Sequence, residues 1–174
     1  MPTPAQLDSL WDFSLALYAQ PDVADTCLRL QDEQGINVNL LLWCVWLECK
    51  GLALDDAHLH EAQRRTRGWD HHYVVPLRHL RKRMKAEFGI QNEVIEGVRK
   101  HIKQAELAAE QQLQMQLQDL TQQWLQQPNG LKPMAIGNTQ FEGRNLRRYL
   151  DDAGVKRGAI DSLVQCLTGV LRSI

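Results

Sequence analysis

The feature that most constrains the fold is one uninterrupted helical pattern over residues 92–127. Apolar side chains recur there from Ile95 to Trp124 about 3.6 residues apart, which is the period of a straight helix. At about 1.5 Å per residue such a helix spans roughly 54 Å. A compact domain of 174 residues has a radius of gyration of about 16 Å. The helix must therefore run the full length of the molecule, project beyond it or bend.

The other long periodic segments also have a helical period. Residues 38–50 are apolar on almost every side, so we expect a central helix that buries Trp43 and Trp46. Pro76 lies inside a pattern from about Trp69 to Phe88 and predicts a kink or the true start of a helix. We find no alternation typical of strands. The sequence predicts an all-α fold, a single bundle of six to eight helices.

The chain is expected to form one domain, residues 1–174. The predicted main bundle covers residues 1–127 and includes the long strut helix at about 92–127. A turn-rich loop is expected at 128–140, and a closing C-terminal helical hairpin at 141–174. At the other end, the segment Thr3–Gln6 resembles a capping box with proline at the first helical position. We expect the first helix to run from there to about Gln20.

Charge is sorted along the chain, although the net charge is −1. Residues 1–61 carry ten acidic side chains against two basic ones, a net charge of −8. Residues 62–103 carry eleven basic side chains against four acidic ones, a net charge of +7. Two such blocks pair within one fold or present a basic face to a partner, and the sequence leaves this choice open.

The basic segment 64–85 is the strongest candidate for an interaction surface. Its basic side chains follow helical spacing opposite an apolar stripe, so they form a basic ridge along the helix expected at about residues 69–88, which we call the ridge helix. We expect an interaction site made of Arg78, Arg81, Lys82, Lys85 and Trp69. The alternatives are ion pairs with the acidic N-terminal half, a protein partner, or nucleic acid. A pI of about 6.6 disfavours nucleic acid, because domains that bind it are usually far more basic.

A polar turn over residues 31–39 separates two apolar helices. Gly35 is suited to end the first helix and Asn37 to cap the second, while Asp32 or Asn39 can bond the exposed helix ends. The alternative is a polar pocket in which Asp32, Asn37 and Asn39 converge with a basic side chain of the ridge helix. Such a pocket would suit an enzyme that binds a small molecule or a diphosphate, although no known motif has this spacing.

The sequence offers no motif for catalysis or metal binding. No serine lies in G-x-S-x-G, and no cysteine has the context of a nucleophile. The pairs His58/His60 and His71/His72 do not share a helix face. We therefore expect no catalytic residue, no metal and no cofactor, and we lean against an enzyme.

Three sequence features bear on location. The four cysteines form no C-x-x-C pair, which is typical of buried thiols in a reducing compartment. The N-terminus shows no signal peptide, and the longest apolar run, Leu40 to Leu47, has eight residues where a membrane span needs about 20. We expect a cytoplasmic protein without a membrane partner.

Two segments carry a resemblance to a known family. They are LWDFSLALYAQPDVADTCLRLQDEQGINVNLLLWCVWLECKG at residues 10–51 and VVPLRHLRKRMK at residues 74–85. The chain resembles, over roughly residues 7–125, an uncharacterised family of small bacterial proteins known as a domain of unknown function. This resemblance implies an all-helical cytoplasmic bacterial protein. It implies no reaction and no active-site residues.

These observations favour a non-catalytic protein–protein interaction or regulatory module of the bacterial cytoplasm, which binds a protein partner or itself. One alternative is nucleic-acid binding through residues 64–85. Another is a small-molecule or diphosphate-binding enzyme with its pocket near Asp32, Asn37 and Asn39. A large exposed apolar patch would favour the first function. An uncompensated basic surface would favour nucleic-acid binding. A deep cavity beside the polar turn would favour the small-molecule or diphosphate-binding enzyme.

Overall fold

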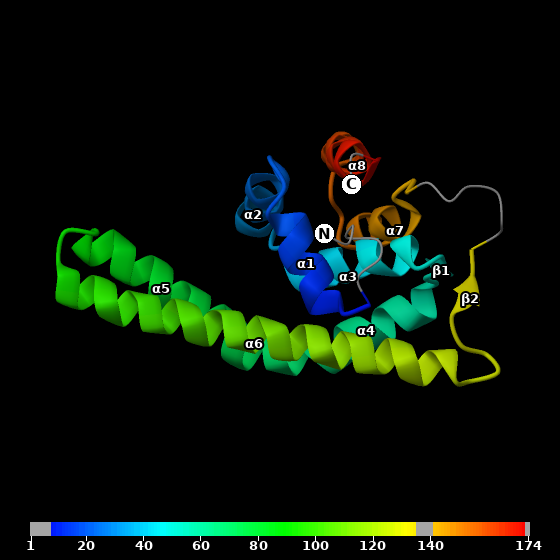
Figure 1. The fold of residues 1–174 in the computed structure, drawn as a ribbon, viewed down its shortest axis with the longest axis horizontal. Coiled ribbons are helices and arrows are strands. Elements are labelled where there is room, and N and C mark those ends of the chain that lie inside the picture. Colours follow the sequence, from blue (N-terminus) through cyan, green and yellow to red (C-terminus); the bar gives the residue numbers. More distant parts are fainter. Residues whose placement is uncertain (1–7, 135–140, 173–174) are drawn as a thin grey trace.

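The computed structural model describes residues 8–134 and 141–172. These residues form an all-α bundle that includes the predicted strut helix, α6, and the predicted C-terminal hairpin, α7 and α8 (Figure 1). The elements in chain order are α1 (Leu10–Tyr18), α2 (Val23–Gln34), α3 (Val38–Cys49), β1 (Leu52–Ala53), α4 (Asp56–Trp69), α5 (Val75–Phe88), α6 (Glu93–Leu125), β2 (Lys132–Pro133), α7 (Arg144–Asp152) and α8 (Arg157–Arg172).

Helix α3 lies at the centre of the fold, as its all-apolar pattern predicts. Both of its tryptophans are buried, which confirms the expectation for Trp43 and Trp46. The indole N–H of Trp43 donates to the hydroxyl of Thr121 on α6 at 2.9 Å. The indole nitrogen of Trp46 is buried without a hydrogen-bond partner among the described residues. Trp43 is therefore held by a polar contact as well as by packing.

Helices α4 and α5 are joined by a π-helical turn, Asp70–Val74. Pro76 is the second residue of α5 and directly follows the π-helical turn, in which the N–H of Val75 donates to the carbonyl of Asp70. Of the two alternatives that the sequence left open for Pro76, a kink or the start of a helix, this position supports the start. The wider π-helical turn accommodates the junction without ending the helical path.

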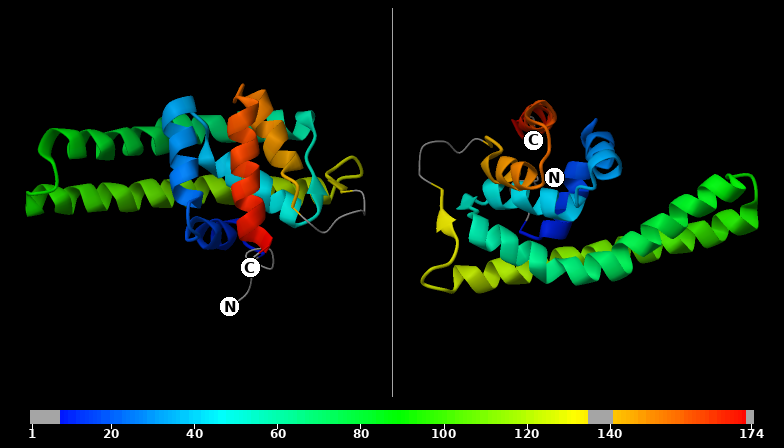
Figure 2. Two further views of the ribbon diagram at one scale, coloured as in Figure 1. Left: turned by 90° about the horizontal axis from the view of Figure 1, so that it is seen from above. Right: turned by 180° about the vertical axis from the view of Figure 1, so that it is seen from behind.

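Helix α6 and its neighbour α5 form an arm. With 33 residues α6 spans about 50 Å. Helix α5 packs along the first half of α6, and Figures 1 and 2 show this hairpin projecting beyond the other helices. The long helix therefore both runs the length of the molecule and overhangs it. Among the described helices, none combines the length and the apolar character that crossing a membrane requires.

Two local features of the structure are not visible in the sequence pattern. Helix α1 begins at Leu10, after an N-cap at Ser9 that accepts from the N–H of Asp12 at 3.3 Å. The segment Thr3–Gln6 lies outside the described residues. The structure also contains strands, because β1 pairs antiparallel with β2. Each strand has two residues, which is too short for an alternating pattern to be visible.

The C-terminal hairpin closes the core over α3. Helix α7 packs on α3, and α8 contacts both α7 and α2. The buried carboxylate of Glu48, near the end of α3, accepts from the backbone N–H groups of Glu142 (2.9 Å), Gly143 (2.8 Å) and Asn145 (3.0 Å). Gly143 has a φ of 74°, and a Cβ there would lie 2.6 Å from Cγ2 of Val164. A glycine is therefore required where α7 begins.

Candidate functional site

Two basic residues of the predicted ridge pair with acids of α6. Arg78 donates from Nε to Glu106 at 3.3 Å and from Nη2 to Glu110 at 2.7 Å. Arg81 donates from Nη2 to Glu106 at 3.0 Å. The side chains of Arg78 and Glu106 are 11% and 7% exposed. These arginines are thus used inside the α5–α6 hairpin, and they do not reach the acidic N-terminal helices.

This ion cluster fixes the base of the arm. Burial raises the pKa of Glu110, and the hydrogen bond from Arg78 works against that rise. The hydrogen bond to Glu106 raises the pKa of Arg81, so this guanidinium stays charged. Removing one partner of a buried ion pair leaves an uncompensated charge, which is strongly destabilising. The cluster therefore holds α5 against α6 in one register.

The other three predicted interaction residues, Lys82, Trp69 and Lys85, have different surroundings. Lys82 pairs with Asp32 of α2, which is the contact expected between the basic and acidic blocks. Trp69 donates its indole N–H to the carbonyl of Ala109 at 2.8 Å and so anchors α4 to α6. Lys85 is exposed and has no ion-pair partner among the described residues. Of the five predicted interaction residues, Lys85 is the one left for an external contact.

The polar turn between α2 and α3 borders a cavity of about 490 Å³ that includes Asp32 and Asn37. Lys82 and His79 of α5 line its other side, so two of the three predicted pocket residues do meet basic side chains of the ridge helix. The hydrogen bond from Lys82 lowers the pKa of Asp32. Asp70 also faces this cavity, and burial raises its pKa.

Asn37 has a structural role at this turn. Its Oδ1 accepts from the N–H groups of Asn39 at 2.9 Å and Leu40 at 3.3 Å, which is the N-cap predicted from the sequence. Its own backbone N–H donates to the hydroxyl of Tyr149 on α7 at 3.0 Å. Asn37 therefore joins the polar turn to the C-terminal hairpin.

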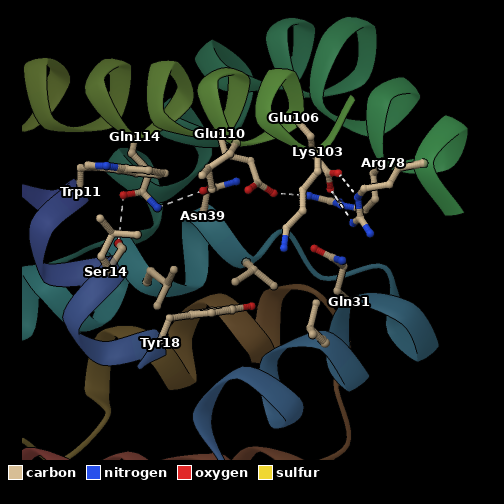
Figure 3. A pocket seen from close by; sticks show the side chains of 16 residues that line it. Trp11, Ser14, Tyr18, Gln31, Asn39, Arg78, Lys103, Glu106, Glu110 and Gln114 are labelled. Carbon is tan, nitrogen blue, oxygen red and sulfur yellow. Dashed lines mark hydrogen bonds and ion pairs between the residues drawn. The ribbon is translucent and has the colours of Figure 1, made fainter. Parts of the chain in front are cut away.

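Asn39 points away from that cavity and into a second one of about 390 Å³, which lies among α1, α2, α3, α5 and α6 (Figure 3). There Ser14 donates to Oε1 of Gln114 at 2.9 Å, and Gln114 donates from Nε2 to Oδ1 of Asn39 at 3.0 Å. All three side chains are buried. Sequence reasoning missed Gln114, because it is one of ten glutamines between residues 104 and 127 and nothing local distinguishes it.

The arm tip, residues 88–98, is a further surface that sequence reasoning missed. Phe88, Ile90, Val94 and Val98 are 52%, 59%, 78% and 49% exposed. In the sequence, Phe88 and Val98 belong to apolar stripes of helical period, a spacing that is typical of buried positions. The stripes continue past the end of the bundle, where the described part of the chain supplies nothing to cover them (Figure 1). The arm tip is therefore an apolar surface held away from the body.

The histidines and cysteines have local roles. His58 Nδ1 lies 2.7 Å from Oδ1 of Asp55, and His60 Nε2 lies 3.0 Å from Oδ1 of Asp152. Within residues 8–134 and 141–172, no three His, Cys, Asp or Glu side chains gather as a metal site. The four cysteines are free, and burial raises the pKa of Cys27 to about 12, so this thiol is a poor nucleophile.

Comparison with known proteins identifies a family. A family model described as "Protein of unknown function (DUF2390)" matches residues 9–117. No curated protein and no solved structure matches the chain. The matched segment holds α1 to α5 and most of α6, and therefore the arm and the helices around both cavities. Helices α7 and α8 lie beyond it.

Proposed function

The chain belongs to the family of proteins of unknown function DUF2390, and we propose that it is a non-catalytic interaction module which binds another protein through its arm tip. The observation that carries this proposal is the exposure of four large apolar side chains within residues 88–98. Apolar side chains that stay in water lose the free energy that burial would supply. An exposed apolar cluster is accordingly a typical mark of a protein interface.

The build of the arm supports the same function. Its base is fixed by the ion cluster of Arg78 and Arg81 with Glu106 and Glu110. A partner therefore meets a surface that is already ordered, which lowers the entropic cost of binding. Charged residues surround the tip, among them Glu93 and the paired Glu96 and Arg99, and a polar rim around an apolar centre is the usual anatomy of an interface.

The pairing of the basic ridge favours a protein over nucleic acid as the partner. Binding to nucleic acid depends mainly on free Lys and Arg side chains that contact phosphates. Arg78, Arg81 and Lys82 each pair with a carboxylate within the chain. The ridge therefore has little uncompensated positive charge to offer a phosphate backbone.

The bacterial cytoplasm is the proposed location. Four free cysteines, two of them fully buried in the core, suit a compartment that keeps thiols reduced. The chain would act there as a binding or regulatory component, with the arm as its contact element.

The test compares two sets of serine variants of the full chain. In the first, Phe88→Ser is combined with Val94→Ser at the arm tip. In the matched control, Met115→Ser changes a side chain of similar exposure, 51%, farther along α6. Circular dichroism and the thermal midpoint first establish that both variants fold. Affinity capture from cells that make the protein, carried out with and without nuclease, then compares what each variant retains, and light scattering measures the mass of each variant in solution.

We expect the tip variant to lose its partner and the Met115→Ser control to keep it. Truncation of two central apolar side chains at an interface costs about 2 kcal/mol or more in total, so the affinity should fall by at least about 30-fold. If the partner is a second copy, the mass in solution falls to that of the monomer for the tip variant alone. Equal capture by both variants would contradict the proposal, and so would capture that nuclease abolishes.

A further inference from the structure

The second cavity, among α1, α2, α3, α5 and α6, has the size and lining of a small-molecule site. Its volume of about 390 Å³ lies within the range of about 300–1,000 Å³ that is usual for such sites. Helices α1 and α2 supply its mainly apolar wall, and α5 and α6 supply its charged wall. The two walls differ in chemistry, and this difference limits what the cavity can bind.

The apolar wall is poorly covered. Trp11 and Tyr18 line it, and Leu15, Leu28 and Leu107 form its exposed rim. These three leucines are among the few large apolar side chains of the described chain that remain exposed, and all three border the same opening. An apolar body seated in the cavity would remove them from water, which is favourable at about 25 cal/mol per Å².

The charged wall has one more cation than it has carboxylates. Arg78, Arg81 and Lys103 line it together with Glu106 and Glu110. The two arginines are paired with the two glutamates. Lys103 has no ion-pair partner among the described residues, and Figure 3 shows its amino group pointing into the cavity from α6. A ligand with one negative charge would balance this wall.

The inner end of the cavity offers a neutral donor. Ser14, Gln114 and Asn39 form a buried chain of hydrogen bonds that uses Oδ1 of Asn39 as its last acceptor. The side-chain amino group of Asn39 donates no hydrogen bond within the described part of the chain, and it is not among the fully buried polar atoms there, so it is accessible from the cavity. It is therefore available to bond a polar atom of a ligand.

We propose that this cavity binds a small amphipathic carboxylic acid, with the carboxylate beside Lys103 and the apolar body against Trp11 and the rim leucines. A neutral molecule of the same shape would leave Lys103 unbalanced, and a cation would meet like charge. This site is separate from the arm tip, so each can be present without the other.

Decanoate, 1-decanol and decylammonium are the probes, used with the full chain below the concentrations at which they form micelles. Isothermal titration calorimetry measures the affinity and the stoichiometry. Lys103→Gln removes the unpaired charge at an exposed position, and Lys100→Gln is its control on the same helix outside the cavity. Leu107→Gln makes the rim polar, and Met115→Gln is the matched exposed control.

We expect decanoate to bind one to one, more tightly than decanol, while decylammonium binds weakest. Lys103→Gln should weaken decanoate by about threefold or more, the effect of one ion pair, and leave decanol unchanged. Leu107→Gln should weaken both, and the two control variants should match the wild type. The proposal is overturned if decanoate shows no saturable binding, if decanol binds as tightly as decanoate, or if Lys103→Gln and Lys100→Gln act alike. None of these results depends on the arm tip.

Discussion

Replacing Glu48 by glutamine tests how the C-terminal hairpin is attached to the core. The Glu48 carboxylate is buried and accepts three backbone hydrogen bonds, two at Oε1 and one at Oε2. Glu142 and Gly143 directly precede α7 and Asn145 is its second residue, and the N-cap, Gly143, has no side chain to cap the helix. Glu48 of α3 therefore supplies from a distance both the cap and the negative charge that a helix N-terminus favours.

The expected loss follows from the geometry. In Glu48→Gln, the retained oxygen keeps the bonds to Glu142 and Gly143, but they become neutral and weaken by about 0.5–1 kcal/mol each. The new amino group faces the N–H of Asn145, and that buried donor, left unbonded, costs about 1–3 kcal/mol. Glu48→Gln should therefore lower the free energy of unfolding by about 2–5 kcal/mol, while Glu33→Gln, a change at an exposed position, should stay within about 0.5 kcal/mol of the wild type.

Urea unfolding followed by circular dichroism at pH 7 measures both variants. The slope of the unfolding free energy against urea should stay unchanged if Glu48→Gln acts on the folded state alone. A Glu48→Gln variant within about 0.5 kcal/mol of the wild type would refute the argument. It would mean that the N–H groups at the start of α7 find other acceptors.

Three further predictions concern stability. Trp43→Phe should cost about 1–3 kcal/mol more than Trp46→Phe in urea unfolding, because Trp43 donates a buried hydrogen bond and Trp46 has no partner among the described residues; equal costs would contradict this. Asn37→Ala should cost about 1 kcal/mol through the lost cap, and an unchanged thermal midpoint would refute that role. The hydrogen bond from Gln63 lowers the pKa of Asp152. Asp152 therefore stabilises the fold at pH values above its unfolded pKa of 3.8, and this contribution disappears as the pH falls through the lower pKa of the folded state. Asp152→Asn should consequently lower the free energy of unfolding at pH 7 by about 0.5 kcal/mol, which is seen as a lower thermal midpoint. In strong acid the variant should match the wild type.

Local signals made much of the fold predictable. The all-apolar stretch that became α3, the Asn37 cap and the proline at the start of α5 each act through neighbouring residues, so the sequence displays them directly. Gly35 likewise ends α2 with a φ of 67°, as expected of a glycine that follows a helix.

The candidate sites depend on contacts that no local pattern contains. Arg78 meets Glu106 and Glu110 at separations of 28 and 32 residues. The block charges left open whether the basic segment pairs with the N-terminal half. Lys82 does pair there, with Asp32, whereas Arg78 and Arg81 pair with acids of α6, because α5 and α6 are adjacent in a hairpin. The apolar stripe through Phe88 has the period of a core helix, and periodicity does not reveal whether a third element covers it. The exposure of the arm tip is therefore visible only once the helices are packed.

The separation between Glu48 and its hydrogen-bond donors has a consequence for the timing of synthesis. Those donors lie 94 to 97 residues later in the chain. A ribosome adds about 5–20 residues per second, so about 5–20 s pass after Glu48 is made before its donors exist. During that interval the Glu48 carboxylate stays in water, because α7, which packs on α3 and supplies these donors, has not yet been made. The surface of α3 around Glu48 therefore remains uncovered until the last quarter of the chain has been translated.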